Sequence, residues 1–219
     1  MATLAAARGA IVVVDYGMGN LRSVWQALVH VADGHQVLVS SDPATVAAAE
    51  RVVFPGQGAM PDCMHEIETR GLRSAVLEAA RNKPFLGICI GQQMLFEHSD
   101  EGNVPGLGLI AGHVRRFPAE KMFDAMGSKL KVPHMGWNEV RHTREHALWK
   151  GIANDARFYF VHSYFVEPQD EDYVVGSTRY GLPFTSAVAR DNIFAIQCHP
   201  EKSAVDGLAM LANFVAWKP

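Results

Sequence analysis

The sequence predicts an α/β fold with a mostly parallel central sheet, helices on both faces, and antiparallel strands in the second half. Two observations support this prediction. In the first half of the 219-residue chain, short apolar runs alternate with segments whose apolar residues recur at helical spacing, which favours βαβ units. In the second half, strand-like runs follow one another with few helical patterns between them, which favours antiparallel pairing there.

The first half opens with a continuous apolar run at residues 10–15, typical of a strand buried on both faces of a parallel sheet. After a glycine-rich turn, Leu21, Val24 and Leu28 fall on one stripe of a helix. The alternation then continues with strands expected at residues 36–39, 51–54 and 83–88, a mostly helical stretch at 60–82 with Gly71 as a weak point, and a helix at 91–98.

The second half is expected to be dominated by strands, at residues 112–117, 157–164, 173–177, 185–189 and 193–198. The chain closes with a helix in which Leu208, Leu211 and Val215 share one face. Residues 118–132 carry many polar and charged side chains and are expected to form an exposed loop.

Composition is that of an ordinary globular protein, with 48% hydrophobic and 20% charged residues. No linker, repeat or low-complexity segment divides the chain, so we expect one domain over residues 10–219 behind an N-terminal extension of residues 1–9. A net charge of −3 gives no electrostatic basis for binding nucleic acid. No apolar run is long enough to span a membrane, and residues 1–9 do not resemble a signal peptide.

The cysteine content indicates a reducing compartment. Cys63, Cys89 and Cys198 form an odd, sparse set that makes a poor disulfide framework. We therefore expect a cytoplasmic protein in which a thiol stays free to react.

Residues 87–91 read Gly-Ile-Cys-Ile-Gly between an expected strand and an expected helix, the pattern of a nucleophile elbow with cysteine in place of serine. The flanking glycines allow a sharp turn, and the helix N-terminus and a nearby protonated histidine would favour the thiolate of Cys89. The N–H that follows Cys89 can donate to an oxyanion. A buried structural cysteine is the competing interpretation, and the surrounding strand and helix favour the catalytic one.

A thiol nucleophile needs a base, usually a histidine that a third group orients. His199 directly follows the strand expected at 193–198, at the strand end where parallel sheets place their sites. Glu201 lies two residues further, and i and i+2 side chains of an extended segment point the same way. His162 is the competing candidate, and spacing alone favours His199 only modestly.

The strand at 51–54 runs into Pro-Gly-Gln-Gly at residues 55–58. Gly56 and Gly58 would let the backbone approach a ligand and turn an N–H towards an oxyanion, although an ordinary Pro-Gly turn has the same composition.

Two other patterns are set aside, and neither a metal nor an organic cofactor is expected. His142, Glu145 and His146 match an inverted zinc-protease motif, but no helical stripe surrounds them, so we interpret them as surface residues. Gly17 and Gly19 begin a dinucleotide-binding pattern whose third glycine is replaced by Arg22.

Taken in chain order, the motifs at residues 55–58 (Pro-Gly-Gln-Gly), 86–93 (Leu-Gly-Ile-Cys-Ile-Gly-Gln-Gln) and 199–201 (His-Pro-Glu) resemble the class I glutamine amidotransferases of the Cys-His-Glu triad type. The resemblance implies Cys89 as nucleophile, His199 as base and Glu201 as the group that orients the base. It also implies an oxyanion donor and contacts to substrate glutamine, at Gly58, Gln93, Ser163 and Tyr164, and it moves His162 into the substrate pocket.

Segments at 15–20, 133–138, 159–164 and 197–203 resemble one branch of that family over nearly the whole chain, the glutaminases that supply ammonia for histidine biosynthesis. This resemblance implies hydrolysis of L-glutamine to glutamate and ammonia, which passes to a separate (β/α)₈-barrel cyclase in a heterodimer. Four residues match positions that face the cyclase near the ammonia passage: Asn20, Trp137, Tyr159 and Lys202. The chain is too short to contain the barrel as well.

Two residues depart from the usual pattern of the family. Gln57 stands where the oxyanion strand usually carries an aliphatic residue, and Cys198 replaces a bulky apolar residue beside the base. Three other functions remain open at this point: a cysteine peptidase of the same elbow architecture, a regulatory subunit with a vestigial site, and a glutaminase of another pathway, such as anthranilate, pyridoxal phosphate or guanine nucleotide synthesis. Residues 133–138 favour the histidine pathway over the last of these.

Overall fold

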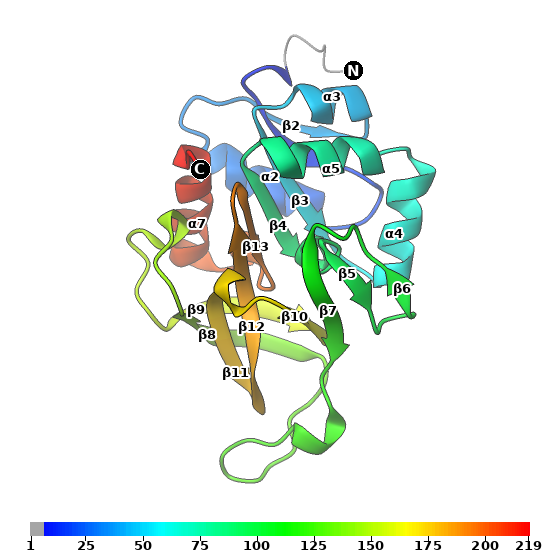
Figure 1. Ribbon diagram of the computed structural model, residues 1–219. Coiled ribbons are helices and arrows are strands. Elements are labelled where there is room, and N and C mark those ends of the chain that lie inside the picture. The colour runs from blue at the N-terminus through cyan, green and yellow to red at the C-terminus, as the bar shows by residue number, and fades with distance from the viewer. Residues whose placement is uncertain (1–6) are drawn as a thin grey trace.

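A mixed sheet of 13 strands organises residues 7–219, the part of the chain that the computed structural model describes (Figure 1). Residues 1–6 of the predicted N-terminal extension lie outside the described residues. The main path of the sheet is β2-β1-β3-β4-β13-β12-β10-β7-β5-β6, and β11, β8 and β9 branch from β12. The strands are β1 (Ile11–Val14), β2 (Val37–Ser40), β3 (Arg51–Gly56), β4 (Phe85–Cys89), β5 (Phe96–Ser99), β6 (Val104–Pro105), β7 (Ile110–Arg116), β8 (His134–His142), β9 (Ala156–His162), β10 (Tyr164–Pro168), β11 (Val174–Tyr180), β12 (Leu182–Arg190) and β13 (Ile193–Ile196).

The first half of the sheet is parallel, as the alternating pattern predicts. β2, β1, β3, β4 and β13 pair in parallel, and all but β2 are buried along their whole length. Two packed helix pairs cover this half, α2 (Leu21–Val31) with α7 (Ala204–Ala216) and α3 (Pro43–Ala48) with α5 (Arg73–Asn82) (Figure 1). Coverage of both faces explains why these strands read as continuous apolar runs.

The helical stretch expected at 60–82 forms α4 (Met60–Thr69) and α5, with a break at Gly71. Gly71 has a φ of +65°, a conformation that glycine adopts without the steric cost of a side chain. The predicted weak point is therefore confirmed. No helix within residues 7–219 is long and apolar enough to cross a membrane.

The second half is largely antiparallel, also as predicted. β12 pairs antiparallel with β13, β10 and β11, and β8 pairs antiparallel with β9 and β11. The single strand expected at 157–164 is in fact two, β9 and β10, which separate at Ser163. Residues 118–132 form the expected loop, with one short 3-10 helix, η1 (Ala119–Lys121). Three further 3-10 helices follow: η2 (Ala147–Trp149), η3 (Glu171–Tyr173) and η4 (Pro200–Lys202).

The prediction of a helix at 91–98 is wrong. Only α6 (Ile90–Gln93) is helical, and Phe96 begins strand β5. A returning loop takes the carbonyls that a longer helix would use, because Leu107 N–H donates to the Met94 oxygen at 2.7 Å and Leu109 N–H donates to the Leu95 oxygen at 2.8 Å. These tertiary hydrogen bonds end the helix after one turn.

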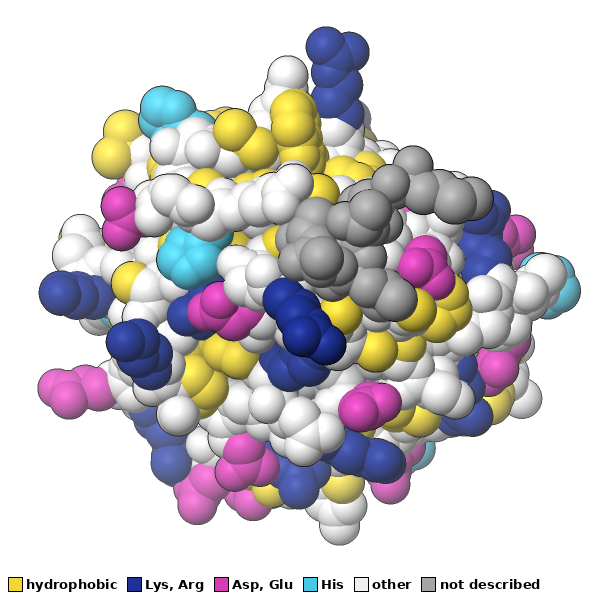
Figure 2. Space-filling view, turned by 90° about the horizontal axis from the view of Figure 1, so that it is seen from above, with side chains coloured by type: hydrophobic (Ala, Val, Ile, Leu, Met, Phe, Trp, Pro, Cys, Tyr) yellow, Lys and Arg dark blue, Asp and Glu magenta, His cyan; other side chains and the backbone are white. Residues whose placement is uncertain are grey.

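The face seen in Figure 2 shows basic and acidic side chains interspersed rather than gathered by sign. The carboxyl ends of the parallel strands instead define the region of interest. Gly56 at the end of β3 stands opposite Cys89 at the end of β4, and Ile88 stands opposite Ile196 of β13. The segments that follow β3, β4 and β13 therefore meet at one edge, where open parallel sheets place their sites.

Candidate active site

Cys89 occupies a sharp turn between β4 and α6. Its φ of 56° and ψ of −114° lie in a region that residues with a side chain rarely adopt. The turn depends on Gly91, because a Cβ there would lie 1.8 Å from the carbonyl oxygen of Phe54 on the neighbouring strand. Strain of this kind, held by tight backbone packing, is typical of functional sites. The sharp turn predicted from Gly-Ile-Cys-Ile-Gly is thus present.

His199 and Glu201 form a buried pair beside this turn. Nδ1 of His199 lies 2.8 Å from Oε1 of Glu201, and the two side chains are 5% and 1% exposed. The His199 backbone is fixed as well, since its N–H donates to the Tyr159 carbonyl at 2.9 Å. Among the described residues, Nε2 of His199 makes no hydrogen bond of ordinary geometry, which leaves it free for a proton transfer.

Burial alone would lower the pKa of His199. The nearby Cys89 sulfur, followed by the Glu201 carboxylate, outweighs burial and raises the pKa of His199 to about 10. A protonated His199 therefore faces the Cys89 sulfur with a proton available for transfer. Since α6 is only four residues long, the positive charge of His199 is expected to act on the sulfur more strongly than a helix dipole.

His162, the competing candidate for the base, has different partners. Its Nδ1 lies 2.8 Å from the Tyr164 carbonyl oxygen and its Nε2 lies 2.9 Å from Nδ1 of His134. Burial, together with His134, lowers the pKa of His162 to about 3, so this ring is neutral. The structure brings His199, and not His162, to Glu201.

A cavity of about 200 Å³ opens on the sulfur. Four of the predicted oxyanion and glutamine-binding residues line it together with Cys89 and His199: Gly58, Gln93, Ser163 and Tyr164. The fifth, Gly56, is buried opposite Cys89 in the strand register. His162 also lines the cavity, so the residues predicted to form a substrate pocket are brought to one place.

Glu101 is a lining residue that sequence reasoning missed. It is the one acidic side chain among the described residues that line the cavity, and its Oε2 accepts a hydrogen bond from Met60 N–H at 2.9 Å. Glu101 follows β5, the strand that replaces the second half of the helix expected at 91–98, and it lines the same cavity as Cys89.

The predicted oxyanion strand is held at several points. Gly58 has a φ of +114°, which favours glycine, and the Gln57 side chain beside it is exposed. Tyr16 donates its hydroxyl to the Pro55 carbonyl at 2.8 Å, and the Cys63 thiol lies 3.7 Å from the Gln57 carbonyl. The departure at Gln57 thus places an amide at the mouth of the cavity rather than in the core.

Three of the four predicted interface residues lie together. Trp137 on β8 stands opposite Tyr159 on β9, with ring centroids 6.2 Å apart. The Lys202 ammonium lies 5.9 Å from the centroid of the Tyr159 ring. Asn20 is at the start of α2, which packs against the 3-10 helix that carries Lys202. Trp137 is 44% exposed, so this cluster is open to a partner.

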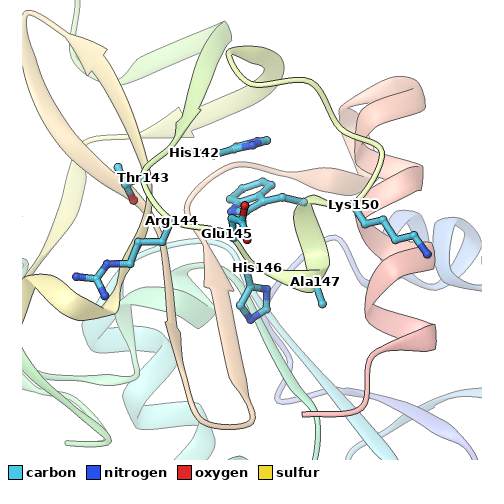
Figure 3. Close-up of a pocket in the computed structure, with 8 residues that line it drawn as sticks. His142, Thr143, Arg144, Glu145, His146, Ala147 and Lys150 are labelled. Carbon is cyan, nitrogen blue, oxygen red and sulfur yellow. The ribbon is translucent and has the colours of Figure 1, made fainter.

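The residues of the inverted zinc-protease motif line a separate, open hollow of about 720 Å³ (Figure 3). β8 ends at His142, and the motif forms no helix, as the sequence indicates. His142 stacks on Trp149 at 4.3 Å, and His146 accepts a hydrogen bond from Leu148 N–H. Within residues 7–219, no group of three or more His, Cys, Asp or Glu side chains is placed to hold a metal ion.

Residues 12–217 match the family model described as glutamine amidotransferase class-I. The chain belongs to the class-I glutamine amidotransferase family. Its relatives include the imidazole glycerol phosphate synthase subunit HisH of Dechloromonas aromatica strain RCB, 71% identical over 95% of this chain and 97% of that protein. The corresponding subunit of Aromatoleum aromaticum is 66% identical over 95% of this chain and 99% of that protein.

Solved structures share the amidotransferase fold. A putative GMP synthase protein from Thermoplasma acidophilum superposes with a TM-score of 0.69 at 18% identity, over 94% of this chain and 92% of that one. A second structure, described as glutamine amidotransferase, superposes with a TM-score of 0.66 at 17% identity, over 92% and 98% of the two chains. At these identities the likeness concerns the fold alone.

Proposed function

We propose that Cys89, His199 and Glu201 hydrolyse L-glutamine in this amidotransferase, which is the HisH glutaminase subunit of imidazole glycerol phosphate synthase in histidine biosynthesis. The observation that supports the three roles best is the buried His199–Glu201 pair, 2.8 Å apart, beside a cysteine on a strained turn. Buried charges at a cavity are a signature of catalytic groups.

The geometry suits a thioester route. The Cys89 thiolate attacks the side-chain amide carbon of glutamine. The oxyanion that forms accepts hydrogen bonds from the backbone N–H groups of Ile90 and Gly58. Protonated His199 gives its proton to the departing nitrogen, which leaves as ammonia. Neutral His199 then takes a proton from water as that water attacks the thioester, and glutamate is released with the Cys89 thiolate restored.

The cavity also suits the ends of an amino acid. At about 200 Å³ it is smaller than the roughly 300–1,000 Å³ typical of drug-sized ligands. Glu101 supplies a carboxylate for the α-ammonium group of glutamine. The Oε1 atom of Gln93 is buried without a partner among the described residues, and it can accept a hydrogen bond from the substrate amide or amine.

The partner of this subunit is a cyclase subunit. We infer a heterodimer with a (β/α)₈-barrel cyclase that docks over Trp137, Tyr159, Lys202 and Asn20 and receives the ammonia. An exposed tryptophan beside an aromatic ring and a cation is the composition that interface centres favour. All three cysteines are free, which also supports our expectation of a reducing, cytoplasmic location.

The test is co-purification with the cyclase, followed by glutamine turnover with and without the cyclase and its nucleotide substrate. We expect turnover to be weak alone and strong in the complex. A diazo-ketone glutamine analogue should label Cys89 selectively. Cleavage of a peptide substrate in place of glutamine, or full turnover without the partner, would contradict the proposal.

A further inference from the structure

A continuous row of hydrogen bonds reaches the nucleophile from strand β8, and the triad does not use it. On the side nearest the sulfur, Gln197 Nε2 lies 3.6 Å from Cys89 Sγ, and Gln197 Oε1 accepts from Gln93 Nε2 at 2.9 Å. Gln93 Nε2 also donates to the Tyr164 carbonyl at 3.1 Å. Gln197 is fully buried, so its contacts with Cys89 and Gln93 are made away from water.

On the other side of the Tyr164 carbonyl, the row continues through two histidines. Nδ1 of His162 lies 2.8 Å from that carbonyl oxygen, and Nε2 of His162 lies 2.9 Å from Nδ1 of His134. Nε2 of His134 lies 3.2 Å from the side-chain nitrogen of Asn138. His134 is 3% exposed and stacks between Tyr180 and Phe160.

The direction of every bond in this row is fixed. A carbonyl oxygen only accepts, so His162 carries its proton on Nδ1 and its Nε2 accepts. His134 must then donate from Nδ1, and its Nε2 accepts from Asn138. The Asn138 amide cannot turn over, because its nitrogen also donates to the Arg179 carbonyl and its oxygen accepts from Glu139 N–H. Burial lowers the pKa of His134 to about 4, in agreement with two neutral rings.

The same reasoning fixes the end near the sulfur. Both protons of Gln93 Nε2 are in use, one on the Tyr164 carbonyl and one on Gln197 Oε1. Gln197 therefore presents its amide oxygen to Gln93 and its amide nitrogen to the sulfur. A donor aimed at Sγ favours the thiolate and fixes its position, whereas an acceptor there would oppose the thiolate.

We propose that Gln197 is a positioning residue that holds the Cys89 thiolate, and that Asn138, His134 and His162 keep it oriented through the Tyr164 carbonyl and Gln93. This inference rests on the proposed function of Cys89. β8 alternates along its length, so His134 and Asn138 point inward while Met135 and Trp137 are 63% and 44% exposed. The row thus begins directly beneath the surface proposed to meet the cyclase.

The first test replaces Gln197 and follows the thiol itself. The measurement is the rate constant for alkylation of Cys89 by iodoacetamide at neutral pH, read from the Cys89 peptide of the full chain by mass spectrometry. Gln197→Met keeps the approximate volume and removes the donor, and we expect a decrease of roughly tenfold or more. Gln197→Glu keeps the bond from Gln93 but turns a carboxylate towards the sulfur, so its decrease should be larger.

The matched control is Gln92→Met. Gln92 is also fully buried on α6 and donates to a β13 carbonyl, that of Ala195 at 3.3 Å, but it does not reach the sulfur. Its alkylation rate constant should stay close to that of the unchanged protein. A purely structural role for Gln197 predicts the opposite order, with Gln197→Glu milder than Gln197→Met, and that order would overturn the proposal.

The second test uses His134 and glutamine turnover by the complex with its cyclase. His134→Phe keeps the stacking but removes the donor to His162, whereas His134→Asn keeps a donor at the Nδ1 position and leaves a cavity. We expect kcat to fall several-fold in His134→Phe and to recover in His134→Asn, with KM little changed. His134→Asn should nevertheless be the less stable protein to urea. Activity that follows stability instead would overturn the proposal.

The same assays separate this inference from the function on which it rests. If Cys89→Ser turns over glutamine, or if iodoacetamide fails to modify Cys89 in the unchanged protein, the proposed role of Cys89 fails. If both results are as expected but Gln197→Met alkylates at the unchanged rate, only the positioning role fails.

Discussion

Two regions of this protein hold histidines and a glutamate beside a hollow, and they differ in what those side chains do. The open hollow at residues 142–150 is the larger, about 720 Å³ against about 200 Å³ for the cavity at Cys89 (Figure 3). In the small cavity, His199 and Glu201 are buried and paired at 2.8 Å. In the large one, Glu145 is exposed, His142 stacks on Trp149 and His146 caps a short helix.

The two regions share residue types, and they differ in the burial and pairing of those residues. A solvent-exposed carboxylate has little effect on the pKa or orientation of its neighbours. A buried carboxylate needs a charged or hydrogen-bonding partner, and it therefore orients that partner. Glu201 has such a partner in His199, which faces the thiol of Cys89. The histidines of the open hollow are instead engaged in stacking and capping. The same kind of change made in both regions therefore tests whether burial and pairing distinguish them.

The largest effect is expected at the nucleophile. Cys89→Ala removes the atom that forms the thioester, so glutamine turnover by the complex should fall by at least about 10⁴-fold. The counterpart in the open hollow is the triple change of His142, Glu145 and His146 to Asn, Gln and Asn, which should leave turnover within about twofold. Substantial turnover by Cys89→Ala would remove the basis of the comparison.

The next largest difference is expected between Glu201→Gln and Glu145→Gln, the same substitution made in each region. Glu201→Gln leaves His199 without a carboxylate to orient and charge it, and kcat should fall roughly 10²–10⁴-fold. Glu145→Gln changes an exposed side chain and should leave kcat unaltered. Steady-state kinetics of both variants in the complex check this pair, and equal losses would mean that burial does not distinguish the regions.

Glycine-to-alanine changes extend the comparison to stability. Gly91→Ala places a Cβ 1.8 Å from the Phe54 carbonyl oxygen, so the backbone must move, at a cost of about 3 kcal/mol. Gly151, next to the open hollow, has a φ of +74° but no atom within 4 Å of its added Cβ. Gly151→Ala should cost about 1 kcal/mol, from backbone conformation alone. Urea unfolding of both variants gives the difference, and a costlier Gly151→Ala would contradict it.

The smallest expected effect is that the stability contributed by His199 and that contributed by His146 change with pH in opposite directions. The pKa of His199 is raised to about 10, so its contribution to stability is complete below pH 6.5 and is lost as pH rises towards 10. Burial lowers the pKa of His146 to about 4, so its contribution is complete above pH 6.5 and is lost as pH falls towards 4. The destabilisation caused by His199→Gln should therefore shrink at alkaline pH, and that caused by His146→Gln at acid pH. Parallel pH profiles in urea unfolding would contradict this.

Much of the fold could be predicted from the sequence because its parallel strands are buried on both faces and read as apolar runs. Cys89, His199 and Glu201 could be singled out partly, because Cys89 sits between glycines and Glu201 follows His199 at strand spacing; their catalytic roles stay a proposal. The helix expected at 91–98 was wrong because the carbonyls of Met94 and Leu95 bond to a loop more than ten residues away, and no local pattern records such bonds. Glu101 was missed for the same reason.

Spacing left the base open between His199 and His162, since both follow strands. What separates them is tertiary: Glu201 beside one ring, and His134 with the Tyr164 carbonyl around the other. Gln197 could not be singled out from its motif, because its contact with Cys89 joins residues 108 positions apart. Asn20, Trp137, Tyr159 and Lys202 stay predictions of a partner surface.

The thioester proposed to form on Cys89 can itself be measured. The complex with the cyclase is mixed with glutamine and the nucleotide substrate, quenched in acid during turnover, and analysed by mass spectrometry. A glutamyl group on the Cys89 peptide, absent from Cys63 and Cys198 and absent in Cys89→Ser, is the predicted result. Steady turnover with every cysteine peptide unmodified would contradict the account.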